Sequence, residues 1–250
     1  MRLSEAYQQH FRVVMADTAD LRNESFRLRH KVYCVEHGFL DALDHPDGRE
    51  RDEYDSHSLH ALLQHQETGR FIGTVRLVLP RPRAERYVMP MAGLCGDPRF
   101  LSGRLLPLAS TAEVSRFAIS HELRRELMAG GASCAQQRRV AMNLTLGLMT
   151  GVLQLSVAAG ITHLCAVMEP ALLRLLARQG ISFAPLGPLV EYHGLRQPAY
   201  GLVRQIVDDL RETHPEHWDI VTDDGRLVVE SDDWTVGADA DREPAMASAA

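Results

Sequence analysis

The stretch "TAEVSRFAIS", Thr111–Ser120, has the apolar content of a buried strand but carries two charges, Glu113 and Arg116. Successive side chains of a strand point to opposite faces, so residues 113 and 116 would lie on opposite faces of a regular strand. A β-bulge between them shifts the register and brings both onto one face. The stretch therefore predicts a central strand, bulged near residues 115–117, with two charges at the entry of a cleft.

The segments on either side of this strand alternate between strand and helix patterns. In order, we expect a helix at 21–37, two antiparallel strands within 59–80, a long irregular connection at 81–110, the strand 111–120, an apolar helix at 134–159, a strand at 162–168, a helix at 170–180, and strands and turns to about 207. Such an order indicates a mixed sheet covered by helices. The connection at 81–110 is long enough to predict a functional or mobile loop.

The apolar run between Arg139 and Glu169 contains no Asp, Glu, Lys or Arg. It is long enough and sufficiently uncharged to raise the question of a membrane span. Gly160, however, is a natural helix stop, and the segment "THLCAVM" after it has the pattern of a strand. We therefore expect a buried helix followed by a buried strand and no membrane span, although peripheral membrane contact stays open.

Charge and composition narrow the class of protein. The chain has 250 residues, is 45% hydrophobic and has a net charge of −6, which argues against a general nucleic-acid binder. From Gln205 onward there are thirteen Asp or Glu against three Arg. We expect one domain at 1–222 and an acidic, disordered tail at 223–250. The four cysteines are scattered and the N-terminal segment has no apolar signal run. These features predict a cytoplasmic protein with reduced thiols and no metal site.

Six charged residues lie in or beside segments that should be buried. They are Arg29, Asp52, Asp55, Arg76, Glu113 and Arg116. Buried charges are costly unless they are paired, so we expect these residues to pair with one another around one site. Taken singly, each also fits an ordinary surface ion pair.

Four motifs in this order carry a family resemblance. They are "RHKVYCVEHGFL" from Arg29, "DEYD" from Asp52, "TVRL" from Thr74 and "EVSR" from Glu113. Their order and spacing resemble the acyl-homoserine-lactone synthases, which belong to the GNAT (Gcn5-related N-acetyltransferase) superfamily, and the related N-acyl amino acid synthases. The residues of "RHKVYCVEHGFL" and "EVSRFAIS" are most similar to the acyltransferases associated with the PEP-CTERM/exosortase system. The resemblance, over residues 10–205, implies an α/β fold: a twisted, largely antiparallel sheet with a V-shaped split between central strands, flanked by helices.

The resemblance also implies an activity. It predicts an N-acyltransferase that moves a medium or long fatty acyl group from an acyl-carrier-protein or CoA thioester to the amine of a small acceptor such as an amino acid, without a tightly bound cofactor. The alternatives are an acyl-homoserine-lactone synthase using S-adenosylmethionine and a non-catalytic acyl-binding or carrier-binding module. Phe39 stands where the synthases have Trp, which disfavours the first alternative. The segment 121–134 contains Gly130 and Gly131 but not the Arg/Gln-x-x-Gly-x-Gly/Ala spacing of acetyl-CoA-dependent relatives, which favours an acyl carrier protein as donor and partner.

Residue roles follow from the matching positions. Glu113 is the candidate general base, with Arg116 beside it; alternatively, Glu113 only orients Arg116 and Arg29. The candidate substrate-binding residues are Arg29, Tyr33, Phe39, Asp52, Asp55, Arg76, Phe117, Ala118 and Ile119. In a second interpretation, Asp52 and Asp55 hold the first helix against the sheet. A carrier protein could dock on Arg124, Arg125, Arg138 and Arg139, unless these form a solvated face. Apolar residues lining an acyl tunnel, or simply forming core, are Leu144, Leu148, Val152, Leu164 and Ala166.

Overall fold

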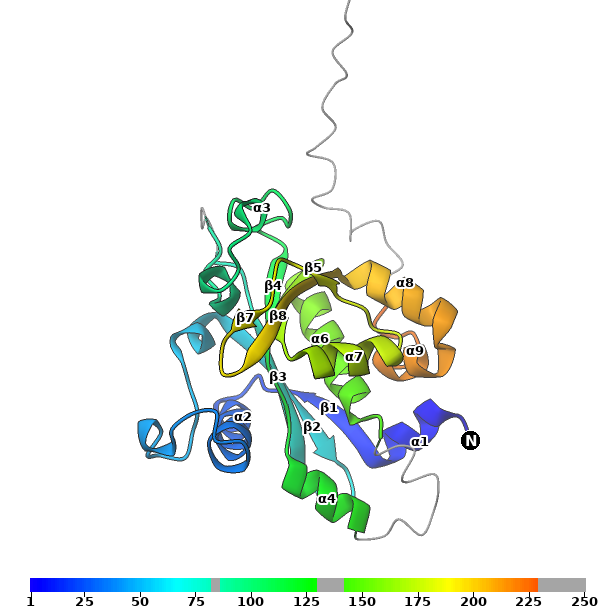
Figure 1. Ribbon diagram of the computed structural model, residues 1–250. Coiled ribbons are helices and arrows are strands. Elements are labelled where there is room, and N and C mark those ends of the chain that lie inside the picture. Colours follow the sequence, from blue (N-terminus) through cyan, green and yellow to red (C-terminus); the bar gives the residue numbers. More distant parts are fainter. Residues whose placement is uncertain (82–85, 130–141, 229–250) are drawn as a thin grey trace, which may run out of the picture.

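A computed structural model of the chain describes residues 1–81, 86–129 and 142–228, and its centre is an eight-stranded sheet (Figure 1). The strands are β1 Phe11–Met15, β2 Ser58–His65, β3 Phe71–Val78, β4 Thr111–Ile119, β5 His163–Met168, β6 Ala184–Pro185, β7 Val190–Glu191 and β8 Leu195–Leu202. Their order is β1-β2-β3-β4-β5-β8-β6, and β7 pairs with β8. Within this sheet β4 and β5 run parallel, whereas the other paired strands are antiparallel. The predicted mixed, largely antiparallel sheet is confirmed.

Helices cover both faces of the sheet. They are α1 Leu3–His10, α2 Ala19–His30, α3 Pro98–Leu101, α4 His121–Ala129, α6 Leu144–Ala159, α7 Pro170–Arg178, α8 Val203–Thr213 and α9 Pro215–Val221; a π-helix, η1 Lys31–Glu36, continues α2, and η2 Ala42–Asp44, η3 Glu53–His57 and η4 Pro90–Gly93 are short turns of 3-10 helix. On β3, Val75 faces α6, whereas its neighbour Thr74 meets Ser25 of α2, with 2.7 Å between the two hydroxyl oxygens. Adjacent strand residues point to opposite faces, so α2 and α6 cover opposite faces.

Close packing of α6 on the sheet depends on glycine. A Cβ atom built on Gly147 would lie 2.1 Å from Oη of Tyr7 and 2.8 Å from Cδ1 of Leu63. We expect Gly147→Ala to lower the free energy of unfolding by about 1–3 kcal/mol, because α6 must move away from α1 and β2. Urea denaturation would measure it. Gly96→Ala is the control, since a Cβ there meets nothing within 4 Å; equal losses in both variants would contradict the packing argument.

The two central strands separate part-way along their length. β4 and β5 pair only over Thr111↔His163, Ala112↔Leu164 and Glu113↔Cys165. Beyond Glu113, β4 continues to Ile119 along β3 without pairing with β5. The expected V-shaped split between central strands is therefore present, and it opens at Glu113.

Most of the predicted elements agree with the structure. The helix expected at 21–37 is α2 with η1, and the paired strands expected within 59–80 are β2 and β3. The irregular connection contains η4 and α3 and packs around its own apolar cluster, which includes Tyr87, Met91 and Phe100. Its residues 82–85 lie outside the described residues.

Two boundaries were wrong, and five elements outside the irregular connection were not predicted. The helix expected from residue 134 is α6, which begins at Leu144 after a turn at residues 142–143. Residues 130–141 lie outside the described residues. The strand expected to continue to 207 ends at Leu202, where α8 begins. Val203, Ile206, Val207 and Leu210 form the buried stripe of α8, a helical period that extends past the segment we read as strand. The helices α1, α4, α8 and α9 and the strand β1 were missed.

The predicted boundary at residue 222 falls beside residues that contact the N-terminal helix. The Gln8 amide donates to the carboxylates of Asp223 and Asp224 at 2.9 and 3.1 Å. Leu227 and Val228 pack against the core. The remainder of the predicted tail, 229–250, lies outside the described residues, so the division into domain and tail stays a prediction. Within the described residues, no helix has the length and hydropathy needed to span a membrane.

Candidate active site

Three arginines and three carboxylates form a closed ring on the α2 face of the sheet. In order around the ring they are Arg29, Glu50, Arg116, Asp52, Arg76 and Asp55, and each link has an N···O distance of 2.5–3.1 Å. The ring is neutral overall and most of it is buried. It joins α2, the loop before η3, β3 and β4. Asp55 bonds Arg29 of α2 and Arg76 of β3, and so links α2 to the sheet, whereas Asp52 bonds Arg76 and Arg116, which both lie on the sheet.

Local structure fixes the carboxylates of this ring. Asp52 precedes η3, and its side chain accepts a hydrogen bond from the Tyr54 N–H at 3.0 Å. The Asp55 side chain accepts from the Asp52 N–H at 2.8 Å, so the two form a capping box. Burial alone would raise the pKa of Glu50, but the hydrogen bonds and charges of Arg116 and Arg29 outweigh burial and lower the pKa to about 2. The same balance, with Arg29 and Arg76 as the cations, lowers the pKa of Asp55.

Glu50 was missed in the sequence. It lies in the turn-rich stretch "DHPDGRERDEYD", where no apolar period marks a residue as buried. The number of charges could have indicated it. The three buried arginines, Arg29, Arg76 and Arg116, need three carboxylates to balance them. Because Glu113 does not pair with them, Asp52 and Asp55 supply only two.

Glu113 stands apart from the ring. Its side chain is 2% exposed, and its Oε2 accepts a hydrogen bond from the Met91 N–H at 2.7 Å. Burial raises its pKa to about 7, with the Met91 hydrogen bond and the charges of Arg76 and Arg116 opposing that rise. The connection before β4, through η4, therefore positions a carboxyl group that exchanges a proton near neutral pH. The alternative role of Glu113, orienting Arg116 and Arg29, receives no support from the described contacts.

A bulge explains why the strand carries two charges. Arg76 pairs with Ser115 and Thr74 with Ala118, so two residues of β4, Arg116 and Phe117, lie opposite one residue of β3. Arg116 has a φ of 49°, in the left-handed region that is unusual for residues other than glycine. The extra residue turns the Arg116 side chain onto the face where Glu113 already lies. The predicted bulge is confirmed.

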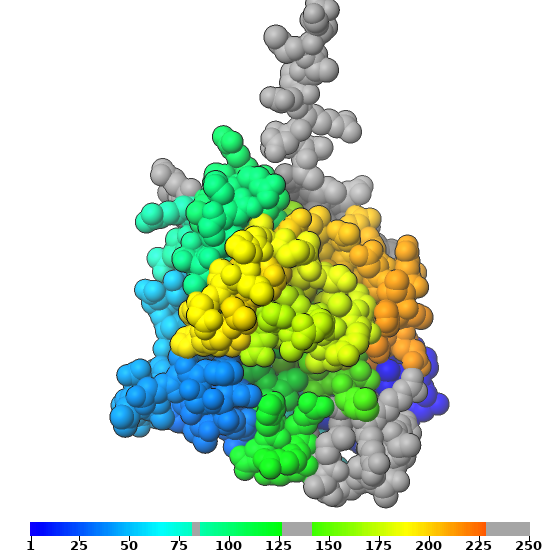
Figure 2. Space-filling model, viewed as in Figure 1, coloured from blue at the N-terminus to red at the C-terminus, as the bar shows by residue number. Residues whose placement is uncertain are grey.

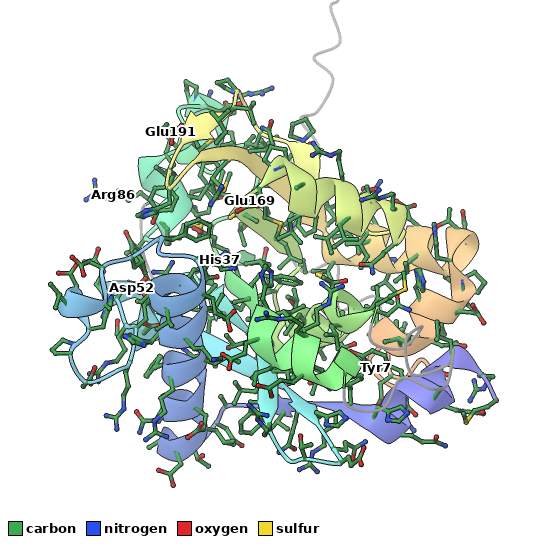
Figure 3. The ribbon with its side chains drawn as sticks, turned by 60° about the horizontal axis from the view of Figure 1, so that its bottom comes forward. Tyr7, His37, Asp52, Arg86, Glu169 and Glu191 are labelled. Carbon is green, nitrogen blue, oxygen red and sulfur yellow. The ribbon has the colours of Figure 1, made fainter. Side chains whose placement is uncertain are left out.

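A cavity of about 400 Å³ occupies the split between β4 and β5. It is lined by Tyr33 of η1 on one face of the sheet and by Thr145 of α6 on the other, so it passes through the split. In Figure 2, the blue surface of α2 and η1 meets the yellow surface of the segment around β8, with the green surface of α4 below. Figure 3 labels His37 and Glu169, which line the cavity from these two sides.

The structure separates the predicted site residues into three groups. Those that line the cavity are Glu113, Arg116, Tyr33, Phe39, Phe117, Ala118, Ile119 and Arg124. Arg29, Asp52, Asp55 and Arg76 belong to the ring and do not line the cavity, whereas Arg116 does both. Arg125 lies exposed on α4, whereas Arg138 and Arg139 lie outside the described residues. The residues predicted either to line an acyl tunnel or to form core belong to the core: Leu144, Leu148, Val152, Leu164 and Ala166. Other residues of α6, β5 and α7 line the cavity, namely Thr145, Val167, Met168 and Leu172.

The first turn of α4 already holds an anion of the chain itself. The Glu36 carboxylate accepts hydrogen bonds from the Ser120 hydroxyl at 2.5 Å and from the His121 N–H at 2.8 Å. Lys31 lies 3.7 Å from the same carboxylate. Backbone N–H groups at a helix start are natural partners of phosphate groups, and here Glu36 takes one of them.

Comparisons with known proteins agree with this architecture. Residues 28–132 match the family model described as "Acetyltransferase (GNAT) domain". BjaI, described as a CoA-dependent acyl-homoserine lactone synthase and solved with MTA, is 23% identical with a TM-score of 0.54, over 89% of this chain and 90% of BjaI. TofI, solved in a ternary complex with an inhibitor and MTA, is 21% identical with a TM-score of 0.53, over 76% of this chain and 90% of TofI.

A third solved structure has a different described activity. FeeM, an N-acyl amino acid synthase from uncultured soil microbes, is 16% identical with a TM-score of 0.50, over 80% of this chain and 94% of FeeM. At these identities the likenesses establish the fold. The chain has the GNAT fold, as predicted.

Proposed function

We propose that this chain is an N-acyltransferase that moves a fatty acyl group from a thioester donor to the amine of a small acceptor such as an amino acid. The observation that carries the proposal is the position of Glu113. It is buried beside the cavity, where β4 and β5 stop pairing, and its pKa is about 7. The cavity is lined from both faces of the split sheet, which supports an approach of donor and acceptor from different sides.

The chemistry requires a base at this point. An acceptor amine is protonated at neutral pH and must lose a proton before it attacks a thioester. A carboxylate with a pKa near the working pH is available in its basic form and remains basic enough to accept that proton, directly or through water. Attack on the thioester also develops negative charge on its oxygen. The edge of β4 that no longer pairs with β5 offers backbone N–H groups to that oxygen.

The donor is proposed to be an acyl carrier protein. CoA carries a pyrophosphate, whereas the pantetheine arm of a carrier protein carries one phosphate. Glu36 already occupies the start of α4, and the sequence at 121–134 lacks the glycine spacing of a pyrophosphate-binding turn. Arg124 and Arg125 on α4 fit an acidic carrier protein by charge. Comparing turnover with acyl carrier protein and CoA thioesters of the same acyl chain tests this choice; faster turnover with CoA would overturn it.

The apolar lining on the β5 side of the cavity is proposed to hold the acyl chain. Leu172 of α7 and Met168 of β5 both line the cavity there. We expect Leu172→Trp to shift the products toward shorter chains, because the indole fills space that a long chain would use. The product profile by mass spectrometry measures this shift. Leu175→Trp, at an exposed position of the same helix, is the control. An unchanged profile in Leu172→Trp would place the chain elsewhere.

The function itself is tested in bacteria that express the protein. Mass spectrometry of organic extracts is compared between the wild type and Glu113→Gln. A new N-acylated amine made only by the wild type would establish acyl transfer, and its mass would identify the chain and the acceptor. An acyl-homoserine lactone would instead establish the synthase reaction. If no product forms while native mass spectra of the purified protein show bound fatty acid, the chain is a non-catalytic binding module.

A further inference from the structure

Arg196 of β8 is a cavity-lining cation that the reaction described above does not use. Its side chain is 13% exposed, and its guanidinium lies 5.6 Å from the ring centre of Phe39. Phe39 follows η1, on the opposite side of the split from β8. The pair therefore joins the two walls of the cavity. Stacking on an aromatic ring leaves the edge of a guanidinium free to bind a planar anion with two hydrogen bonds.

The partners of Arg196 differ from those of Arg116, the other well-buried arginine of the cavity wall. Arg116 donates three hydrogen bonds to Glu50 and Asp52 inside the ring, so its charge is fully balanced. Among residues 1–81, 86–129 and 142–228, the partners of Arg196 are the Glu169 carboxylate at 3.1 Å and the Leu195 carbonyl at 3.2 Å. The Glu169 side chain is 45% exposed. A ligand carboxylate can replace this exposed partner without leaving a buried charge unpaired.

The turn before β8 is built to place this guanidinium. Gly194 has a φ of 94°, and a Cβ there would lie 3.3 Å from Nη1 of Arg196. The Gly194 N–H donates to Oε1 of Glu191 at 3.0 Å, and its carbonyl accepts from the Tyr192 N–H at 2.9 Å. Arg196 is therefore presented to the cavity by a tight turn instead of a loose loop.

From this arrangement we infer that Arg196 binds the carboxylate of the acceptor and selects α-amino acids over simple amines. The inference rests on the proposed function for the reaction, but concerns a residue that the proposed chemistry does not need. A zwitterionic acceptor then has a partner for each charge: Arg196 faces its carboxylate, and Glu113 receives the proton of its ammonium group. In this assignment Arg196 is a binding residue and not a catalytic one.

The test is a competition between matched acceptors. Purified wild-type chain, Arg196→Gln and Arg196→Lys are given an acyl thioester and a panel of protein amino acids, each mixed with the amine formed by its decarboxylation. The wild type should acylate amino acids preferentially. Arg196→Gln should lower that preference at least about 30-fold, mainly by raising KM for the amino acids. Turnover of the amines should stay within about two-fold of the wild type. The reason is that losing a charged hydrogen-bond pair weakens the binding of only the acceptor that carries the carboxylate. Arg196→Lys should keep part of the preference, because lysine keeps the positive charge but cannot donate two parallel hydrogen bonds to a carboxylate.

Arg174→Gln, at an exposed position of α7, is the matched control and should leave the preference unchanged. An unchanged preference in Arg196→Gln, or a wild type that prefers the amines, would overturn the inference. Direct calorimetric binding of the amino acids separates the two proposals. Binding that Arg196→Gln abolishes, without any acyl product, would support the carboxylate site and overturn acyl transfer. Amine acylation without amino-acid binding would do the reverse.

Discussion

Glu113→Gln should lower kcat for acyl transfer by at least about 100-fold while leaving the fold intact. The glutamine keeps the shape of the side chain, and its amide oxygen can still accept the Met91 hydrogen bond. It cannot accept the proton of the amine. Single-turnover assays with a fixed thioester and saturating acceptor would measure the loss. Glu126→Gln, an exposed carboxylate on α4 paired with Arg70, is the matched control and should retain full activity. Wild-type turnover by Glu113→Gln would remove this residue from the chemistry.

The pH profile gives this prediction a second readout. Because the pKa of Glu113 is about 7, wild-type kcat should rise with pH through 7 and then level off, as the carboxyl group becomes the basic form. The residual activity of Glu113→Gln should not rise with pH in this way. If the same rise of kcat remains in the variant, it comes from the titration of another group.

As pH rises toward 7, the free energy of unfolding should fall while the activity rises. Glu113 has a pKa of about 7 in the fold against 4.5 as a free group, so the folded state holds its proton more tightly between those values. This preference stabilises the fold below pH 4.5 and is lost as pH rises through 7, a change of about 3 kcal/mol. Glu113→Gln does not titrate. Its melting temperature relative to the wild type should therefore rise between pH 4.5 and 7 and stay constant above pH 7.

Glu50→Gln should lower the free energy of unfolding by about 3–5 kcal/mol, because removing one partner leaves buried arginine charge unbalanced. Glu50 is bonded to both Arg29 and Arg116, so one substitution breaks two links of the ring. Urea denaturation at pH 7 would measure the loss. Asp47→Asn is the control, since its pair with Arg51 is exposed and should be worth less than about 1 kcal/mol. Similar losses in both variants would show that the ring is not what stabilises α2 on the sheet.

Acid should have the same effect on the wild type as this substitution. The pKa of Glu50 is about 2 in the fold against 4.5 as a free group, so the stabilisation is complete above pH 4.5 and is lost as pH falls toward 2. The size of the change is about 3 kcal/mol. Glu50→Gln should be correspondingly less sensitive to acid over this window, which acid titration followed by circular dichroism would show.

The sequence predicted the fold well because its strongest signals are local. The alternation in "TAEVSRFAIS", the stop at Gly160 and the paired strands around residues 67–69 each depend on neighbouring residues. The bulge was predictable for the same reason, since two charges three positions apart in one strand require it if they share a pocket. The helix α8 was missed because its period becomes visible only over the three turns of Val203–Thr213, which extend beyond the segment that resembled a strand.

The site could be predicted only in part because its partners are distant along the chain. Arg29, Asp55 and Arg76 were expected to pair, and they do. Their buried position in a ring, and not on the cavity wall, depends on Glu50, which nothing local distinguishes from its charged neighbours. Phe39 and Arg196 are separated by more than 150 residues, so only the fold brings them together. The resemblance to exosortase-associated acyltransferases stays a prediction.

The short seam between β4 and β5 has a mechanical consequence. Three residue pairs hold together two halves of the sheet, β1–β4 and β5–β8, so the seam can serve as a hinge line. An extended donor lying along the free edge of β4 would act as a temporary strand, adding backbone bonds where the sheet has none. Under the proposed function, a bound donor would then strengthen the contact between the two halves of the sheet, and that contact would be lost when the product leaves.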